Sequence, residues 1–266
     1  MLEIIIVLIL LFLFTLRCRS AHPGMEALKG WSYAHRGLHG NGVPENSMAA
    51  FKAALNGGYG IELDIHLLKD GNLAVIHDSL LNRTTGQPGR IEDLTTEQLK
   101  DYRLEGTEET IPEFMDVLTL YNGKAPLIVE LKPVDGNHAA LTEAACRMLE
   151  SYKGSYCLES FDPRCIAWLK KNRPQIIRGQ LTENYFKSRS DLPDYLKFLL
   201  KHNMTNFLTV PDFVAYRYAD RKDTVTNDIC RRLWKAQGVS WTLRTPDEYR
   251  VAVDEGWLPI FEGFRP

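Results

Sequence analysis

From Trp31 to the C-terminus, short apolar runs alternate with longer segments of helical periodicity. This alternation is typical of repeated strand–helix units around a parallel sheet. Eight such units in one chain favour an α/β fold of the TIM-type (β/α)8 barrel class over an open doubly wound sheet. No dinucleotide-binding glycine motif and no P-loop motif are present, which further disfavours the doubly wound alternative. The predicted strands span residues 32–34, 61–66, 127–131, 155–159, 176–180, 206–210, 239–242 and 259–261.

Helices are expected between these strands, and two of them begin with clear N-terminal signals. Asp162-Pro163 and Thr245-Pro246 each place a proline in the first helical turn, directly after a capping side chain. Residues 70–111 are long for one strand–helix connection, so we expect a small insertion after the second strand. The predicted helices span residues 47–55, 95–102, 113–120, 138–152, 163–171, 193–202, 227–237 and 246–254.

Composition excludes some classes of function. The 266 residues include 32 Lys and Arg against 34 Asp and Glu, so the chain has no overall positive field that would attract nucleic acid. The five cysteines are odd in number and form no C-x-x-C pair, which indicates neither a disulfide framework nor a zinc site. A reducing compartment fits this cysteine usage best.

The N-terminus is the apolar part of the chain. Residues 4–16 are apolar apart from Thr15, and Arg17 and Arg19 follow them. The run is shorter than the roughly 20 residues of a full bilayer span. We nevertheless predict a hydrophobic membrane anchor with a transmembrane helix over 1–20, a linker over 21–30 and a barrel domain over 31–266. The positive-inside rule places Arg17 and Arg19, and with them the barrel domain, in the cytoplasm. A processed export signal is the alternative, but no basic segment precedes the run and no small-residue cleavage site follows it.

Two carboxylates stand on a strand that should be apolar. Glu62 and Asp64 share one face of the strand at 61–66 because side chains alternate with a period of two, while isoleucine and leucine fill the other face. Unpaired buried charge is costly, so a cation should lie between the two acids. The strand at 127–131 repeats the arrangement, with Glu130 and Lys132 on one face.

The carboxyl ends of barrel strands form the active site in this fold class, so these acids should converge. Three carboxylates in one barrel mouth repel each other unless a divalent cation binds among them. An all-oxygen ligand set favours Mg²⁺ or Ca²⁺ over zinc. We therefore predict that Glu62, Asp64 and Glu130 hold a divalent cation.

Basic side chains and histidines lie at the same strand ends. Arg36 and Lys132 are suited to an anionic, phosphate-like substrate. His35 ends the first strand, His77 follows a short apolar run at 73–76, and the two can act as acid and base. Metal-assisted phosphoester cleavage follows as the predicted reaction class.

Other polar and aromatic residues have simpler interpretations. The segment 217–223 is interpreted as a solvated charged loop, and His39 as a surface residue in a glycine-rich loop. Trp168 and Trp234 are expected in the core. The remaining histidines, expected to be structural or exposed to solvent, are His22, His66, His138 and His202.

From Trp31 onward, the motifs resemble those of the glycerophosphodiester phosphodiesterases. The apolar N-terminal segment lies outside this resemblance. The matching residues, in the family's order, are Ala34-His35-Arg36-Gly37, Pro44-Glu45-Asn46-Ser47, Glu62-Leu63-Asp64-Ile65, Lys69-Asp70-Gly71, His77-Asp78, Asn82-Arg83-Thr84-Thr85, Ile111-Pro112-Glu113, Glu130-Leu131-Lys132, Glu159-Ser160-Phe161 and Trp241-Thr242.

The resemblance implies hydrolysis of glycerophosphodiesters to sn-glycerol 3-phosphate and an alcohol. It assigns the metal to Glu62, Asp64 and Glu130, acid–base catalysis to His35 and His77, and phosphate binding to Arg36 and Lys132. Phe161 and Trp241 match aromatic positions that line the family's pocket, although both could be plain core aromatics. The segment 44–47 is expected to cap the first helix and to brace the neighbouring loop through Glu45 and Asn46.

Two alternative functions remain open. A lysophospholipase D would keep the chemistry but act on membrane lysolipids, to which an N-terminal tether would give access. A non-catalytic membrane-anchored binding barrel is disfavoured because both histidines and all three acids are intact.

The chain departs from the family at 261–266, where a Thr-Asp segment is common and Phe261-Glu262-Gly263 stands instead.

Overall fold

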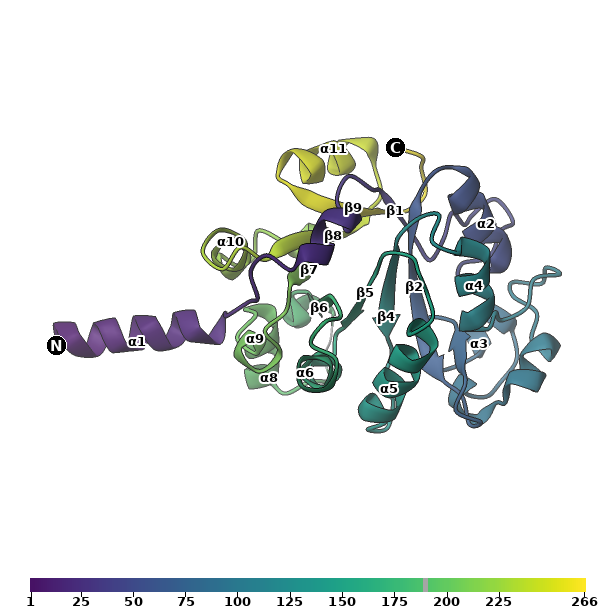
Figure 1. Ribbon diagram of the computed structural model, residues 1–266, viewed down its shortest axis with the longest axis horizontal. Helices are drawn as coiled ribbons and strands as arrows, with labels where there is room; N and C mark the ends of the chain where they lie inside the picture. The colour runs from purple at the N-terminus through teal and green to yellow at the C-terminus, as the bar shows by residue number, and fades with distance from the viewer. Residues whose placement is uncertain (189–190) are drawn as a thin grey trace.

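The computed structural model describes residues 1–188 and 191–266, and in these residues eight parallel strands close into a barrel (Figure 1). The hydrogen-bonded order is β1-β9-β8-β7-β6-β5-β4-β2, and β1 also pairs with β2, which completes the ring. β3 lies outside the ring and pairs antiparallel with β2. The predicted TIM-type barrel is therefore confirmed. The strands are β1 (Tyr33–His35), β2 (Gly60–Leu67), β3 (Leu73–Val75), β4 (Leu127–Leu131), β5 (Tyr156–Ser160), β6 (Arg178–Thr182), β7 (Phe213–Arg217), β8 (Gln237–Leu243) and β9 (Trp257–Phe261).

Helices surround the strands, and two of them start where the Asp162-Pro163 and Thr245-Pro246 signals predict. Asp162 and Thr245 cap α6 and α11 with their side chains, and a proline follows each of them. The α-helices are α1 (Leu2–Thr15), α2 (Met48–Asn56), α3 (Asn82–Thr85), α4 (Phe114–Tyr121), α5 (His138–Leu149), α6 (Pro163–Asn172), α7 (Tyr185–Ser188), α8 (Asp194–Lys201), α9 (Asn206–Thr209), α10 (Thr226–Arg232) and α11 (Pro246–Asp254). The 3₁₀-helices are η1 (Pro23–Leu28), η2 (Ile91–Asp93), η3 (Thr96–Asp101) and η4 (Tyr218–Asp220).

Two local predictions were wrong. Residues 206–210 were expected to form a strand, but 206–209 form the short helix α9, and the strand at this place in the barrel is β7. The segment 217–223 is not a free solvated loop, because Arg217 ends β7 and Asp220 is buried with 2% of its surface exposed. The predicted helix at 95–102 is the 3₁₀-helix η3, which begins with a capping box formed by Thr95 and Gln98.

The strands separate two cores. Ile61, Leu63 and Ile65 on β2 pack with Phe114 and the other apolar residues of the α4 and α5 helices, in the layer between barrel and helices. Inside the barrel, a second cluster joins apolar residues from several strands, among them Ile128 of β4. Since Ile128 and Glu130 share a face, the inner face of β4 is apolar at one end and acidic at the other.

The connection from β2 to α4 is the small insertion that the sequence predicts. It contains β3, α3, η2 and η3. Its buried apolar residues form their own cluster, which includes Ile76, Leu81, Ile91 and Leu99. The insertion therefore has enough core to hold a fixed position beside the ends of β2 and β3.

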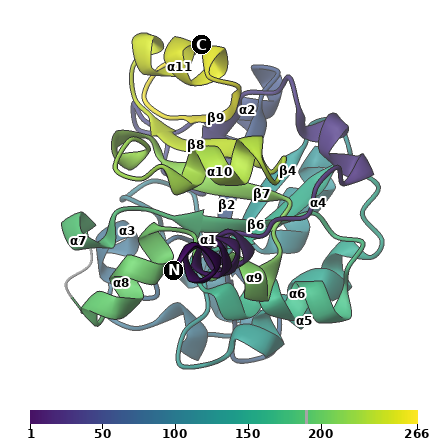
Figure 2. The same ribbon diagram turned by 90° about the vertical axis from the view of Figure 1, so that its left-hand side faces the viewer.

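The N-terminal segment has two parts. The apolar side chains of α1 are exposed, and the helix extends away from the barrel, as Figure 1 shows from the side and Figure 2 shows end-on. From Leu16 onward the chain packs on the barrel, where Arg19 pairs with Asp212 at 2.5 Å. The segment 21–30, expected as a linker, contains η1 and buries Met25 and Leu28.

α1 is 14 residues long, and nearly all of its residues are apolar. In the part of the chain that the structure describes, no helix combines the length and the apolarity needed to cross a membrane, so the predicted transmembrane helix is not supported.

Candidate active site

Three buried carboxyl groups meet at the carboxyl ends of β2 and β4. Asp64 lies directly opposite Glu130 in the parallel register of these strands, and Glu62 is one inward-facing position earlier. Each of the three offers a carboxylate oxygen within 4.8 Å of the others. Their exposed fractions are only 3%, 0% and 7% for Glu62, Asp64 and Glu130. We call these three residues the carboxylate centre.

The protonation of the centre reflects its crowding. Burial and then the neighbouring Asp64 and Glu130 charges raise the pKa of Glu62 well above its ordinary value. Burial raises the pKa of Glu130 to about 7, against the opposing effect of Lys132. Burial would also raise the pKa of Asp64, but Lys132 and other nearby cationic groups lower it below its usual range. If all three groups were ionised, their charges would outnumber those of Arg36 and Lys132, and the raised pKa values of Glu62 and Glu130 reflect this crowding.

Arg36 and Lys132 line this centre, as the sequence predicts. Lys132 Nζ lies 2.9 Å from Glu130 Oε1 and 3.4 Å from Asp64 Oδ1. Arg36 Nε lies 3.3 Å from Asp64 Oδ2, and its backbone N–H donates to Glu62 Oε2 at 3.1 Å. Both cations thus lie directly beside the acids of the carboxylate centre.

The turn after β1 explains how Arg36 can reach inward. Arg36 and Gly37 both have left-handed backbones, with φ of 54° and 81°. A Cβ at Gly37 would lie 2.8 Å from the Cβ of Ala50 in α2, so glycine lets the turn pack directly on that helix. Asn46 adds a further fixed contact, because its Nδ2 donates to Asp64 Oδ2 at 2.9 Å.

A series of hydrogen-bonded ion pairs connects Arg36 to His77. Glu45 Oε1 accepts from Arg36 Nη1 at 3.0 Å and from Arg83 Nη2 at 2.6 Å. Arg83 also donates to Asp78, whose other oxygen lies 2.5 Å from His77 Nδ1. Glu45 therefore braces the loop as expected, and the insertion supplies Arg83 and His77 to the site.

His77 is held at both its side chain and its backbone. The hydrogen bonds from Arg83 and His77 lower the pKa of Asp78, although burial alone would raise it, so Asp78 is an acceptor. The contact between Asp78 and His77 therefore requires a proton on Nδ1 of His77, so in the neutral ring Nε2 carries none. Burial lowers the pKa of His77 to about 4. His66 is structural, as expected: its Nδ1 contacts Glu92 at 2.7 Å and its Nε2 contacts the His77 carbonyl at 3.1 Å.

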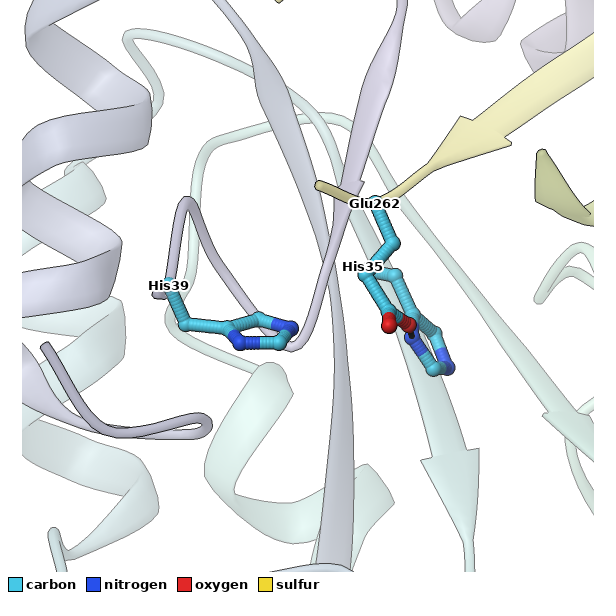
Figure 3. A group of neighbouring side chains, drawn as sticks. All are labelled: His35, His39 and Glu262. Atoms are coloured by element: carbon cyan, nitrogen blue, oxygen red, sulfur yellow. Dashed lines mark hydrogen bonds and ion pairs between the residues drawn. The ribbon is translucent and has the colours of Figure 1, made fainter. Parts of the chain in front are cut away.

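His35 has a partner that the sequence reasoning missed. Its Nδ1 lies 2.6 Å from Oε2 of Glu262, the residue directly after β9, and its Nε2 lies 3.8 Å from Glu62 Oε2. Figure 3 shows the Glu262 carboxylate beside the His35 ring and, in this view, between that ring and the ring of His39. His39 is half-buried rather than a surface residue. Only the spatial closure of the barrel brings positions 35 and 262 together, so no local pattern marks this contact.

A fourth buried acid was also missed as a site residue. Glu159 on β5 is 1% exposed and lies opposite Glu130 in the β4–β5 register. Burial and the nearby Glu130 charge raise its pKa well above the ordinary value. Its signal in the sequence is an acid near the carboxyl end of the predicted strand at 155–159, the same feature that marks Glu130.

Two cavities open on either side of the carboxylate centre. The smaller, of about 260 Å³, is lined by polar groups that include His35, Arg36, Arg217 and Arg244, together with Trp241. The larger, of about 910 Å³, is lined by His77, Glu130 and Lys132, by Phe161, and by many apolar side chains. Phe161 and Trp241 meet edge to face with ring centroids 5.5 Å apart, so they lie together between the cavities.

The residues of the centre fit a hard divalent cation. Oδ1 of Asp64 and Oε2 of Glu159 are buried without a hydrogen-bond partner among the described residues. Four buried carboxyl groups, counting Glu159, face two cationic side chains, Arg36 and Lys132. Oxygen ligands of this kind are those that Mg²⁺ and Ca²⁺ prefer.

The sequence of the chain is similar to those of several glycerophosphodiester phosphodiesterases. A Bacillus altitudinis glycerophosphodiester phosphodiesterase is 38% identical over 161 residues, which cover 56% of this chain and 65% of that protein, so the chain spans less than two thirds of this relative's length. Mouse glycerophosphodiester phosphodiesterase 1 is 30% identical over 246 residues, covering 81% of this chain and 72% of the relative.

Solved structures agree on the fold. A phosphodiesterase from Oleispira antarctica, solved with the product sn-glycerol-3-phosphate, superposes with a TM-score of 0.72 at 22% identity. The match covers 88% of this chain and 93% of that structure. The model of the glycerophosphoryl diester phosphodiesterase family matches residues 35–261, which contain every residue of the carboxylate centre and both histidines. The chain belongs to the glycerophosphoryl diester phosphodiesterase family.

Proposed function

We propose that the chain hydrolyses glycerophosphodiesters to sn-glycerol 3-phosphate and an alcohol, in a reaction that depends on Mg²⁺ or Ca²⁺. The observation that supports it most is the convergence of the carboxylate centre, Arg36 and Lys132 between two histidines that face separate cavities. Family membership and the product bound to the Oleispira antarctica relative agree with this substrate class.

Each group has a role that follows from its position. Glu62, Asp64 and Glu130 would hold the divalent cation, which when bound would neutralise phosphoryl charge in the transition state. Arg36 and Lys132 bind the non-bridging phosphoryl oxygens, and the guanidinium can contact two of them at once. Phe161 and Trp241 line the substrate cavities and limit the access of water to the phosphoryl group.

The two histidines transfer protons to and from the attacking oxygen, which bonds to phosphorus, and the alcohol oxygen, which leaves it. One histidine enters the step neutral, and its Nε2 takes the proton of the attacking hydroxyl as that oxygen bonds to phosphorus. The other enters protonated on both ring nitrogens and gives its Nε2 proton to the alcohol oxygen as that P–O bond breaks. The attacking hydroxyl belongs to water, or to the glycerol of the substrate if a cyclic phosphate forms first and is then hydrolysed. In both routes the products are a phosphomonoester and an alcohol.

Release of sn-glycerol 3-phosphate from glycerophosphocholine and glycerophosphoethanolamine tests this proposal. We expect His35→Ala and His77→Ala each to lower kcat by roughly 10²- to 10⁴-fold, because each removes a positioned acid or base. His22→Asn is the matched control, since His22 lies in the N-terminal segment and asparagine can still cap η1. Wild-type rates in either variant of the catalytic pair would overturn the assignment.

The larger cavity favours a second candidate, lysophospholipase D activity on lysolipids. The groove begins at His77, Glu130 and Lys132 and continues along Leu196 and Leu200 of α8. Its volume of about 910 Å³ lies at the upper end of the usual range for small-molecule sites, roughly 300–1,000 Å³. Glycerophosphocholine has no apolar chain to fill it, whereas the acyl chain of a lysolipid does.

A chain-length series separates the two candidates. If the groove binds acyl chains, kcat/KM for lysophosphatidylcholines should rise with chain length by up to about fourfold per methylene until the groove is filled. Leu196→Gln should lower that value for the lysolipid and leave glycerophosphocholine turnover unchanged. Leu208→Gln, at an exposed leucine of α9, is the control. Equal rates for all chain lengths would contradict a lysolipid role.

The location of the chain in the cell stays a prediction. We propose that the barrel domain is cytoplasmic, on the evidence of Arg17 and Arg19 after the apolar run. Protease added to intact cells should then leave the domain undigested. Digestion from outside would favour the exported alternative.

A further inference from the structure

Glu262 reaches His35 across the seam where the barrel closes. β9 pairs with β1 in parallel, so the residue after Phe261 emerges next to the residue after Ala34. The Glu262 side chain turns toward the His35 ring, and Oε2 lies 2.6 Å from Nδ1 (Figure 3). Both side chains are mostly buried, with 22% and 13% of their surfaces exposed. The contact is therefore largely sheltered from water.

The Glu262 carboxylate is itself held in place. Its backbone N–H donates to the carbonyl of Leu243 at 2.9 Å, which ties the residue to the end of β8. Arg244 Nη2 lies 3.4 Å from Oε1 and 3.3 Å from Oε2, so it contacts both carboxylate oxygens. The hydrogen bond from His35 is the largest of the effects that lower the pKa of Glu262 to about 2, so the group is ionised. An ionised carboxylate can only accept, and Nδ1 of His35 must carry the proton.

We propose that Glu262 is the positioning residue of His35: it fixes the tautomer that leaves Nε2 unprotonated and directed at the carboxylate centre. The proposal rests on the proposed function, since it assigns Glu262 a part in the same proton transfers. The geometry repeats at His77, whose Nδ1 faces Asp78 at 2.5 Å. Both histidines of the pair thus have a carboxylate on Nδ1, which leaves Nε2 as the nitrogen that can exchange protons with the substrate.

The role has two consequences, and the effect on kcat separates it from a purely structural ion pair. A positioning carboxylate affects kcat while substrate binding stays the same, because Glu262 does not reach the phosphoryl site and Arg36 and Lys132 are untouched. It also determines which His35 nitrogen carries the proton, with or without substrate. An ion pair that only links β9 to β1 would also set this tautomer, but its loss would change stability and leave kcat unchanged.

The test combines kinetics with histidine ¹⁵N NMR on the full-length protein. Glu262→Gln keeps the shape of the side chain but removes its charge, and its amide can donate to Nδ1. We expect kcat with glycerophosphocholine to fall about 10- to 100-fold with KM unchanged. The His35 resonances, identified by their loss in His35→Gln, should change from the Nδ1–H tautomer toward Nε2–H.

Two further variants complete the experiment. Glu262→Asp keeps the charge but shortens the reach by one methylene, so its kcat should lie between wild type and Glu262→Gln. Glu255→Gln is the matched control, since Glu255 precedes β9 at its other end and pairs with Arg221 at 3.0 Å. This variant should retain the wild-type kcat and His35 tautomer.

The outcomes have distinct meanings. A wild-type kcat in Glu262→Gln, or an unchanged His35 tautomer, would overturn the positioning role of Glu262. No turnover by the wild-type chain under any condition would instead refute the proposed function, and the tautomer of His35 would still report whether Glu262 sets its protonation.

Discussion

When Glu130 is ionised, its buried charge lowers the free energy of unfolding, and replacing the residue should show by how much. Burial raises its pKa from 4.5 to about 7, and at 1.36 kcal/mol per pKa unit this shift corresponds to about 3 kcal/mol. Below pH 4.5 both the folded and the unfolded chain hold the proton, so there is no penalty. Between pH 4.5 and 7 only the folded chain holds it, so stability falls as pH rises. Above pH 7 the whole penalty is present.

Glu130→Gln mimics the protonated form and should remove this penalty. In EDTA at pH 8, we expect the variant to be more stable than wild type by up to about 3 kcal/mol, which is about 6–12 °C in Tm for a chain of this size. At pH 4.5 the two should melt together. Added Ca²⁺ or Mg²⁺ should raise the Tm of wild type and have little effect on the variant, which has lost a ligand.

Circular dichroism melts at the two pH values, with and without the cation, measure these effects. Glu143→Gln is the control, because Glu143 is exposed on α5 in the same strand–helix unit. If Glu130→Gln is no more stable than wild type in EDTA at pH 8, or if the cation stabilises both equally, the description of the carboxylate centre is wrong.

Three further predictions concern the surroundings of the centre. Ser47→Ala removes the side-chain cap of α2 and should lower the free energy of unfolding by about 1 kcal/mol, measured in urea, with no change in kcat. Arg83→Met leaves Glu45 and Asp78 without their shared partner, so kcat should fall as His77 loses its fixed orientation, and steady-state kinetics would show a wild-type kcat if that bracing has no effect. Because Glu130 must lose its proton to bind a cation, Ca²⁺ affinity by calorimetry should rise from pH 6 to pH 8, and a pH-independent affinity would contradict this.

The carboxylate centre was predictable because it follows from local periodicity. Glu62 and Asp64 interrupt an apolar strand at a spacing of two, and Glu130 and Lys132 repeat that spacing on a second strand. Parallel strands in a barrel bring such positions to the same end, which the structure confirms in the register of Asp64 with Glu130.

The misassigned segments show where local pattern is ambiguous. Residues 206–210 are too short and too mixed to distinguish a strand from a helical turn, and they form α9. The true strand, β7, ends in Arg217 at the start of a charged segment, which concealed it. Glu262 could not be assigned a role, because its contact with His35 spans 227 residues and depends on barrel closure.

The most direct test of the account is the dependence of glycerophosphocholine hydrolysis on a divalent cation. Protein treated with EDTA should release no sn-glycerol 3-phosphate, and Mg²⁺ or Ca²⁺ should restore release in the wild type but not in Glu62→Gln. Full turnover in EDTA, or full restoration in Glu62→Gln, would contradict the claim that the carboxylate centre holds a catalytic cation.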